Sequence, residues 1–228
     1  MARKPLIYAW TVIAAGTVVA ASAVLPWQPK DIATFLVCLG LAALSSTFKV
    51  KLSAAADGTI SPAFVFLLVA IGRLGWSETI VIGVASALVQ CLWRRSNRAS
   101  ALQVGFNTAA MAIAGGLAFG VAHGLAQSDG DPMLLLAVSG VVLLVTNTLL
   151  VAAIMCLLQH APIYRVWRSL QPRVVPYYLA GGVLAGVWSR ADLTTGVSVA
   201  VMAAASVYLL SLWYRELDTQ VPPAGQAA

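Results

Sequence analysis

Hydrophobic residues form long runs along this chain, and polar residues gather in the short stretches between the runs. A helix that spans a bilayer needs about 20 mainly apolar residues, with a range of roughly 17 to 25. Eight runs fall in or near that range, and we therefore predict an all-α fold, a polytopic membrane bundle of about eight transmembrane helices. The predicted helices are residues 6–25, 32–48, 60–76, 79–93, 101–125, 133–158, 174–188 and 193–213.

Three of the predicted helices, 60–76, 79–93 and 174–188, are short for a full crossing. A non-spanning segment is tolerated at membrane depth only where neighbouring protein satisfies its backbone. Two of the three could therefore form a re-entrant hairpin that is buried among the other helices. The sequence leaves open whether these three segments cross completely.

Composition supports lipid as the solvent for much of the surface. Of the 228 residues, 60% are hydrophobic and only 10% are charged, whereas soluble domains carry about 25% charged residues. The mean hydropathy is +0.87 and the net charge is +6. The basic excess is not gathered on a long polar segment, so we expect no nucleic-acid partner.

The basic residues also predict an orientation, because lysine and arginine favour cytoplasmic loops. With both termini inside and eight crossings, eleven of the fourteen basic residues lie inside, and only Lys30, Arg73 and Arg190 lie outside. We therefore predict an N-in/C-in protein of the bacterial inner membrane, with one transmembrane domain (1–215) and a disordered cytoplasmic tail (216–228). The inside set is Arg3, Lys4, Lys49, Lys51, Arg94, Arg95, Arg98, Arg165, Arg168, Arg173 and Arg215.

Polar residues within the apolar runs are the candidate ligand-binding residues, since polar groups at membrane depth are costly and often functional. They are Asn107, Asn147, Gln103 and Ser61. Two interpretations stay open: the amides bond one helix to another, or they line a central pocket and contact a ligand. No hydrolase, zinc or phosphate-loop motif occurs. We expect no catalytic residues, no metal and no cofactor.

The stretch 161–173 alternates apolar residues with arginines. Such a stretch is able to lie among anionic headgroups, or it is a simple anchored loop. Trp167 and Arg168 are its candidate signalling surface. Elsewhere, glycines recur every four residues at 116, 120 and 124, and again at 182 and 186. That spacing lets another helix approach closely, either within the bundle or in a homodimer.

Several short blocks resemble the integral membrane sensor domains that precede GGDEF cyclase or HD-GYP phosphohydrolase domains in bacteria. The resemblance covers about residues 30 to 216 and implies a cytoplasmic C-terminus and a role in signal input. No such effector domain occurs in this sequence, so we expect no cyclic-dinucleotide chemistry from it. The blocks are 58–66 (GTISPAFVF), 78–95 (ending LWRR), 104–107 (VGFN), 146–152 (TNTLLVA), 166–168 (VWR), 176–181 (PYYLAG) and 208–215 (YLL to YR).

The sequence thus favours a non-enzymatic sensory or regulatory membrane module that passes a signal to a cytoplasmic partner. The alternative is a small-molecule uptake subunit of a membrane transporter, similar in character to the substrate-binding subunits of energy-coupling-factor transporters. Asn107 and Asn147 would then contact the substrate.

Overall fold

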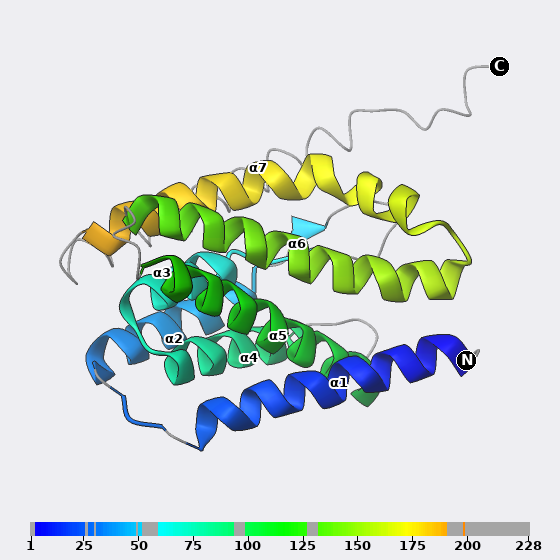
Figure 1. The fold of residues 1–228 in the computed structure, drawn as a ribbon, viewed down its shortest axis with the longest axis horizontal. Coiled ribbons are helices and arrows are strands. Elements are labelled where there is room, and N and C mark those ends of the chain that lie inside the picture. The colour runs from blue at the N-terminus through cyan, green and yellow to red at the C-terminus, as the bar shows by residue number, and fades with distance from the viewer. Residues whose placement is uncertain are drawn as a thin grey trace.

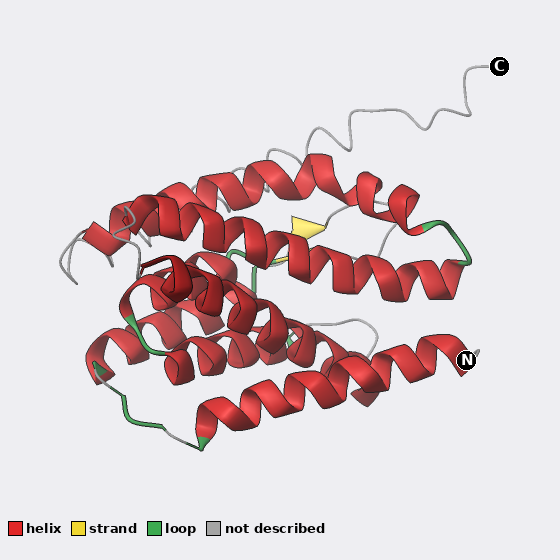
Figure 2. Ribbon diagram, viewed as in Figure 1, coloured by secondary structure: helices red, strands yellow, loops and turns green. Residues whose placement is uncertain are grey.

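The computed structural model describes residues 3–25, 27–29, 31–48, 50–51, 59–93, 99–126, 132–190 and 198. Within these ranges the chain is helical apart from turns and one pair of two-residue strands (Figures 1 and 2). The predicted helix 193–213, apart from Ser198, and the predicted tail lie outside the described residues. The elements are α1 (Arg3–Val24), α2 (Ile32–Ser46), β1 (Val50–Lys51), β2 (Thr59–Ile60), α3 (Ala63–Arg73), α4 (Trp76–Leu92), α5 (Ala101–Ala126), α6 (Pro132–Gln159) and α7 (Ile163–Arg190).

The longest apolar runs form helices close to their predicted bounds, and this confirms the helical class. Three helices are long and apolar enough to cross a membrane: Arg3–Val24, Ala101–Leu125 and Leu134–Gln159. Local signals end some of the helices. The Asp31 carboxylate accepts a hydrogen bond from the Thr34 N–H and caps α2. His160, with a φ of 52°, ends α6 in the left-handed conformation.

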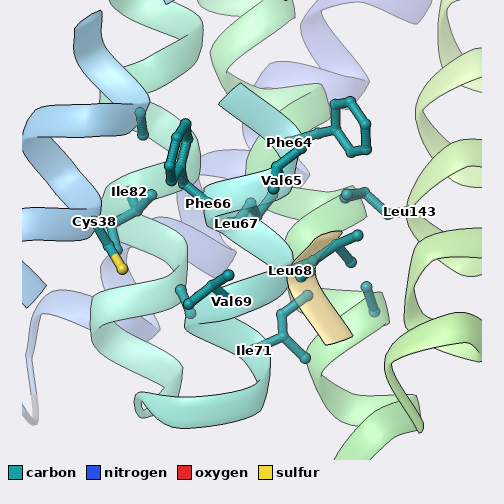
Figure 3. Packing of buried hydrophobic residues seen from close by; sticks show 14 of the residues in the cluster. Cys38, Phe64, Val65, Phe66, Leu67, Leu68, Val69, Ile71, Ile82 and Leu143 are labelled. Carbon is teal, nitrogen blue, oxygen red and sulfur yellow. The ribbon is translucent and has the colours of Figure 1, made fainter. Parts of the chain in front are cut away.

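Helix α3 is short and lies at the centre of the bundle (Figure 3). Its 11 residues span about 16 Å, roughly half of a hydrocarbon core of about 30 Å. Every residue from 63 to 71 is at most 5% exposed. Helices α2, α4, α5, α6 and α7 all contact it. The predicted helix 60–76 is therefore shorter than expected, since it begins after Pro62 and ends before Gly75.

Leucines of α3 pack against glycines of the surrounding helices. A Cβ built on Gly140 of α6 would lie 3.6 Å from Leu68 Cδ1, and one built on Gly83 of α4 would lie 3.4 Å from Leu67 Cδ1. The missing side chains thus make room for α3, as expected where helices associate through van der Waals packing. The approach is still closer between α1 and α5, where a Cβ on Gly16 would clash with the backbone of Ala109.

The predicted glycine grooves are only partly filled. A Cβ on Gly116 would lie 2.9 Å from the Trp76 ring, whereas one on Gly120, Gly124 or Gly182 would meet no described atom within 4 Å. Gly116 therefore belongs to the packing inside the bundle.

The two-residue strands pair antiparallel, with Val50 opposite Ile60 and Lys51 opposite Thr59. The sequence predicted only a loop here. In Figure 2 the strands lie alongside the helices, between the two ends of α6 rather than beyond them. Helices α2 and α3, which flank the strands, therefore form a pair whose connecting strands lie within the length of the bundle.

Helix α7 differs most from its prediction. The sequence predicted a helix over 174–188 after a separate amphipathic connection, but one helix runs from Ile163 to Arg190. Pro172 and Pro176 lie inside it; each lacks the N–H of a backbone hydrogen bond, yet the helix continues through both. Trp188, near the end of α7, is 1% exposed and packs edge-on against Phe66, with ring centroids 5.7 Å apart.

Charged residues are distributed unequally between the two ends of the bundle. The beginning of α1 and the α6–α7 connection lie at one end in Figure 1, and the α1–α2 connection, the α3–α4 turn and the end of α7 lie at the other. The described part of the first end carries basic residues only, Arg3, Lys4, Arg165 and Arg168. The second end carries both described acidic residues, Asp31 and Glu78, together with Arg73 and Arg190.

Candidate functional site

The polar residues of α6 hold α7 at two points. Asn147, which is partly buried, forms a side-chain hydrogen bond with the hydroxyl of Tyr178 on α7. Tyr178 is 7% exposed, and its ring stacks on Phe64 of α3 with centroids 4.2 Å apart. This contact therefore joins the central helix, α6 and α7.

The second point lies nearer the beginning of α7. Trp167 Nε1 donates a hydrogen bond to Thr148 Oγ1 over 3.2 Å. The same hydroxyl donates to the Leu144 carbonyl of its own helix over 2.6 Å, which fixes its orientation. Trp167 and Tyr178 are separated by about three turns of helix, so α7 is held along its length.

Asn107 makes a different contact. Its Nδ2 lies 3.3 Å from Sγ of Cys91, a buried residue of α4. The amide therefore bonds one helix to another, in agreement with the structural interpretation of this residue. Asn107 binds α4 whereas Asn147 binds α7, so the two amides have different partners.

The other two candidate ligand residues are also separated. Ser61 Oγ donates to the Ser45 carbonyl over 3.1 Å and accepts from the Ala63 N–H over 3.2 Å. It thereby links α2 to the start of α3. Gln103 is exposed near the beginning of α5. The described contacts do not bring Asn107, Asn147, Gln103 and Ser61 into one group.

Four exposed residues surround the start of α7. We call this group the basic corner and define it as Pro162, Tyr164, Arg165 and Arg168. These four residues line an open depression. Arg168 Nη1 donates to the Tyr164 hydroxyl over 3.0 Å, and its guanidinium lies 5.7 Å from the centre of the Tyr164 ring. Tyr164 therefore orients this arginine rather than leaving it free to sample many rotamers.

The opposite end carries the two described carboxylates. Asp31 accepts hydrogen bonds from the Thr34 hydroxyl and N–H, and these bonds hold the pKa of its carboxyl below the ordinary value. Glu78 is only 2% exposed in the first turn of α4. The described residues hold no group of three or more metal-ligating side chains.

The sequence analysis missed Tyr178 and Cys91, the partners of the two asparagines. The signal for Tyr178 was present, since a tyrosine within an apolar run needs a partner for its hydroxyl. Cys91 gave no comparable signal, because cysteine in an apolar run is usually a small buried hydrophobe.

No protein-family model, curated protein or solved structure matches this chain. The fold and the site therefore define the class on their own. The described chain is a bundle of apolar helices, three of them of membrane-spanning length, as in a helical membrane protein. Its polar contacts join helices to one another, and its exposed arginine pair lies at one end.

Proposed function

We propose that this protein is a non-enzymatic sensory or regulatory module of the bacterial inner membrane that passes a signal to a cytoplasmic partner. The basic end of the bundle faces the cytoplasm, as the preference of lysine and arginine for that side favours. The acidic residues Asp31 and Glu78 then face the outside.

In this orientation α1, α5 and α6 cross the membrane. Helices α2 and α3 have 15 and 11 residues, and the strands that join them lie within the bundle. We propose that this pair enters from the outer face and returns to it. A re-entrant pair and two full crossings both return the chain to the same side of the membrane. The orientation of α4 and of each later helix is therefore the same in either case.

The observation that carries the proposal is the continuity of α7. One helix joins the basic corner at residues 162–168 to Tyr178 in the core, and α6 holds it through Asn147 and Thr148. Pro172 and Pro176 lie between Trp167 and Tyr178, but the backbone stays helical through both, and a displacement at Tyr178 therefore reaches Trp167 and Arg168. The protein thus has a buried input region and an exposed output end on one element.

A photo-crosslinking amino acid placed at Arg168 tests this function. In cells we expect it to capture a cytoplasmic signalling protein, with at least fivefold less capture when Trp167→Ala is added. The same probe at Arg190, on the opposite end of α7, is the control and should capture no cytoplasmic protein.

Uptake of a small molecule gives a different result. Cells would accumulate a substrate, the accumulation would fall in Asn107→Leu or Asn147→Leu, and the Arg168 probe would capture no signalling protein. That outcome would replace the sensory proposal with a transport subunit.

A further inference from the structure

The basic corner combines two arginines, an aromatic ring and a helix terminus. Arg165 and Arg168 are exposed and three residues apart, so they lie on one face of α7. Val166 between them is 8% exposed and anchors the turn to the bundle. The two guanidinium groups are therefore presented together on an ordered helix.

The chemistry of the corner suits a phosphate group. Guanidinium groups bind phosphate through paired N–H donors and do so better than ammonium groups. The first N–H groups of α7 also lie here, and the positive end of a helix dipole favours an anion. The described part of this end has no acidic side chain that would compete.

The surroundings of the corner indicate where the phosphate comes from. Leu158 and Ile163, which flank the α6–α7 turn, are 47% and 44% exposed, and Tyr164 is 63% exposed. Apolar side chains next to exposed arginines are typical of a surface at the boundary between headgroups and acyl chains. A soluble phosphate compound would gain nothing from these apolar neighbours, whereas a lipid would cover them.

We propose that the basic corner binds the phosphate of an anionic lipid headgroup in the cytoplasmic leaflet. This deepens the proposed function and rests on it for its consequence, which is regulatory. A lipid at Arg165 and Arg168 stabilises one position of the start of α7, next to Trp167. The anionic lipid content of the membrane then biases the output end.

Lipid retention by the purified full chain tests the binding. The chain is placed in nanodiscs of phosphatidylcholine and phosphatidylglycerol in equal amounts, extracted into mild detergent, and its retained lipids are counted by native mass spectrometry. We expect at least fivefold more phosphatidylglycerol than phosphatidylcholine. The Arg165→Gln/Arg168→Gln variant should lose this preference, and Arg190→Gln, the same charge change at the other end of α7, should keep it.

Equal retention of the two lipids by the unaltered chain would overturn the proposal. An equal loss of preference in Arg190→Gln would also overturn the proposal, because the lipid preference would then depend on net charge and not on the basic corner. Inorganic phosphate at 5 to 10 mM, added as a competitor (concentrations on the order of those that saturate a millimolar site), should displace little of the lipid. Full displacement would identify a soluble phosphate as the ligand.

The result is separable from that of the proposed function. If lipid retention shows no preference while the Arg168 crosslink still captures a signalling protein, the corner is a protein-contact surface and only the lipid assignment fails. If the preference is present and no crosslink forms, the lipid site stands and the signalling role fails. Circular dichroism of each variant should match that of the unaltered chain, because both arginines are exposed.

Discussion

Helix α3 and the basic corner use their side chains in opposite ways. Five helices surround α3, and its leucines fill the space beside glycines of its neighbours. In the basic corner, by contrast, Tyr164, Arg165 and Arg168 are exposed. The side-chain hydrogen bond described there joins Arg168 to the Tyr164 hydroxyl and orients the arginine. The difference teaches that packing fixes the region around α3, whereas the start of α7 is available for contacts outside the chain.

The largest effect should come from a cavity beside α3. Leu68 is fully buried, so Leu68→Ala should lower the free energy of unfolding by roughly 2–5 kcal/mol. Leu134→Ala is the matched control, since that leucine is 60% exposed and its loss should have little effect. Unfolding titrations in mixed micelles measure both. Equal losses in the two variants would show that α3 is not the packing centre.

Crowding the α1–α5 crossing should have the next largest effect. Gly16→Ala places a methyl group against the Ala109 backbone, and the resulting overpacking should cost about 1–3 kcal/mol. Gly120→Ala adds the same methyl group where no described atom lies within 4 Å and should be neutral or slightly stabilising. The same titration distinguishes them, and the reverse order of stabilities would contradict the described crossing.

Removing the polar contact between α6 and α7 should have a smaller effect on stability and a clear effect on the corner. Asn147→Leu removes the amide partner of the buried Tyr178 hydroxyl and should cost about 0.6–1.7 kcal/mol, as hydrogen bonds between membrane helices do. If α7 transmits the change, a spin label at Arg168 should alter its mobility in this variant. In Asn107→Leu, which loses a contact to α4 instead, the label should be unchanged. Identical spectra for Asn147→Leu and the unaltered chain would show that α7 does not transmit a change at Tyr178 to Arg168.

The smallest effect concerns pH at the end opposite the corner. Hydrogen bonds from Thr34 lower the pKa of the Asp31 carboxyl in the folded chain, so the ionised form favours folding. This contribution is present above the unfolded value, about pH 4, and is lost as pH falls through the lower folded value. As the pH is lowered from 5 to about 3, the midpoint temperature of thermal unfolding should therefore decrease less in Asp31→Asn than in the unaltered chain. An identical decrease in both proteins would show that the Asp31 carboxylate does not contribute to this pH dependence.

The sequence predicted helix bounds best where a long apolar run alone determines the element. The runs that became α1, α5 and α6 are long and apolar, and their ends lie within a few residues of the predicted ones. Helix α7 was predicted too short because arginines and two prolines in 163–176 resemble an interfacial connection. The contacts of α6 with Trp167 and the bundle around Tyr178 sustain the helix there, and sequence patterns do not report such tertiary support.

The candidate site was predicted by residue type and not by partner. Asn107 and Asn147 were identified because an amide in an apolar run must be paired, and both are paired. A shared pocket was one of the two interpretations that the sequence left open. The described contacts do not bring the two amides together, since Asn107 contacts α4 and Asn147 contacts α7.

The most direct test concerns the side of the membrane that the basic end faces. In a chain with its three native cysteines replaced by alanine, Tyr164→Cys and Asp31→Cys are each treated with a thiol reagent that does not cross membranes. The account predicts that Asp31→Cys reacts in cells with a permeabilised outer membrane and that Tyr164→Cys reacts only in inverted inner-membrane vesicles. Reaction of both from the same side would contradict it.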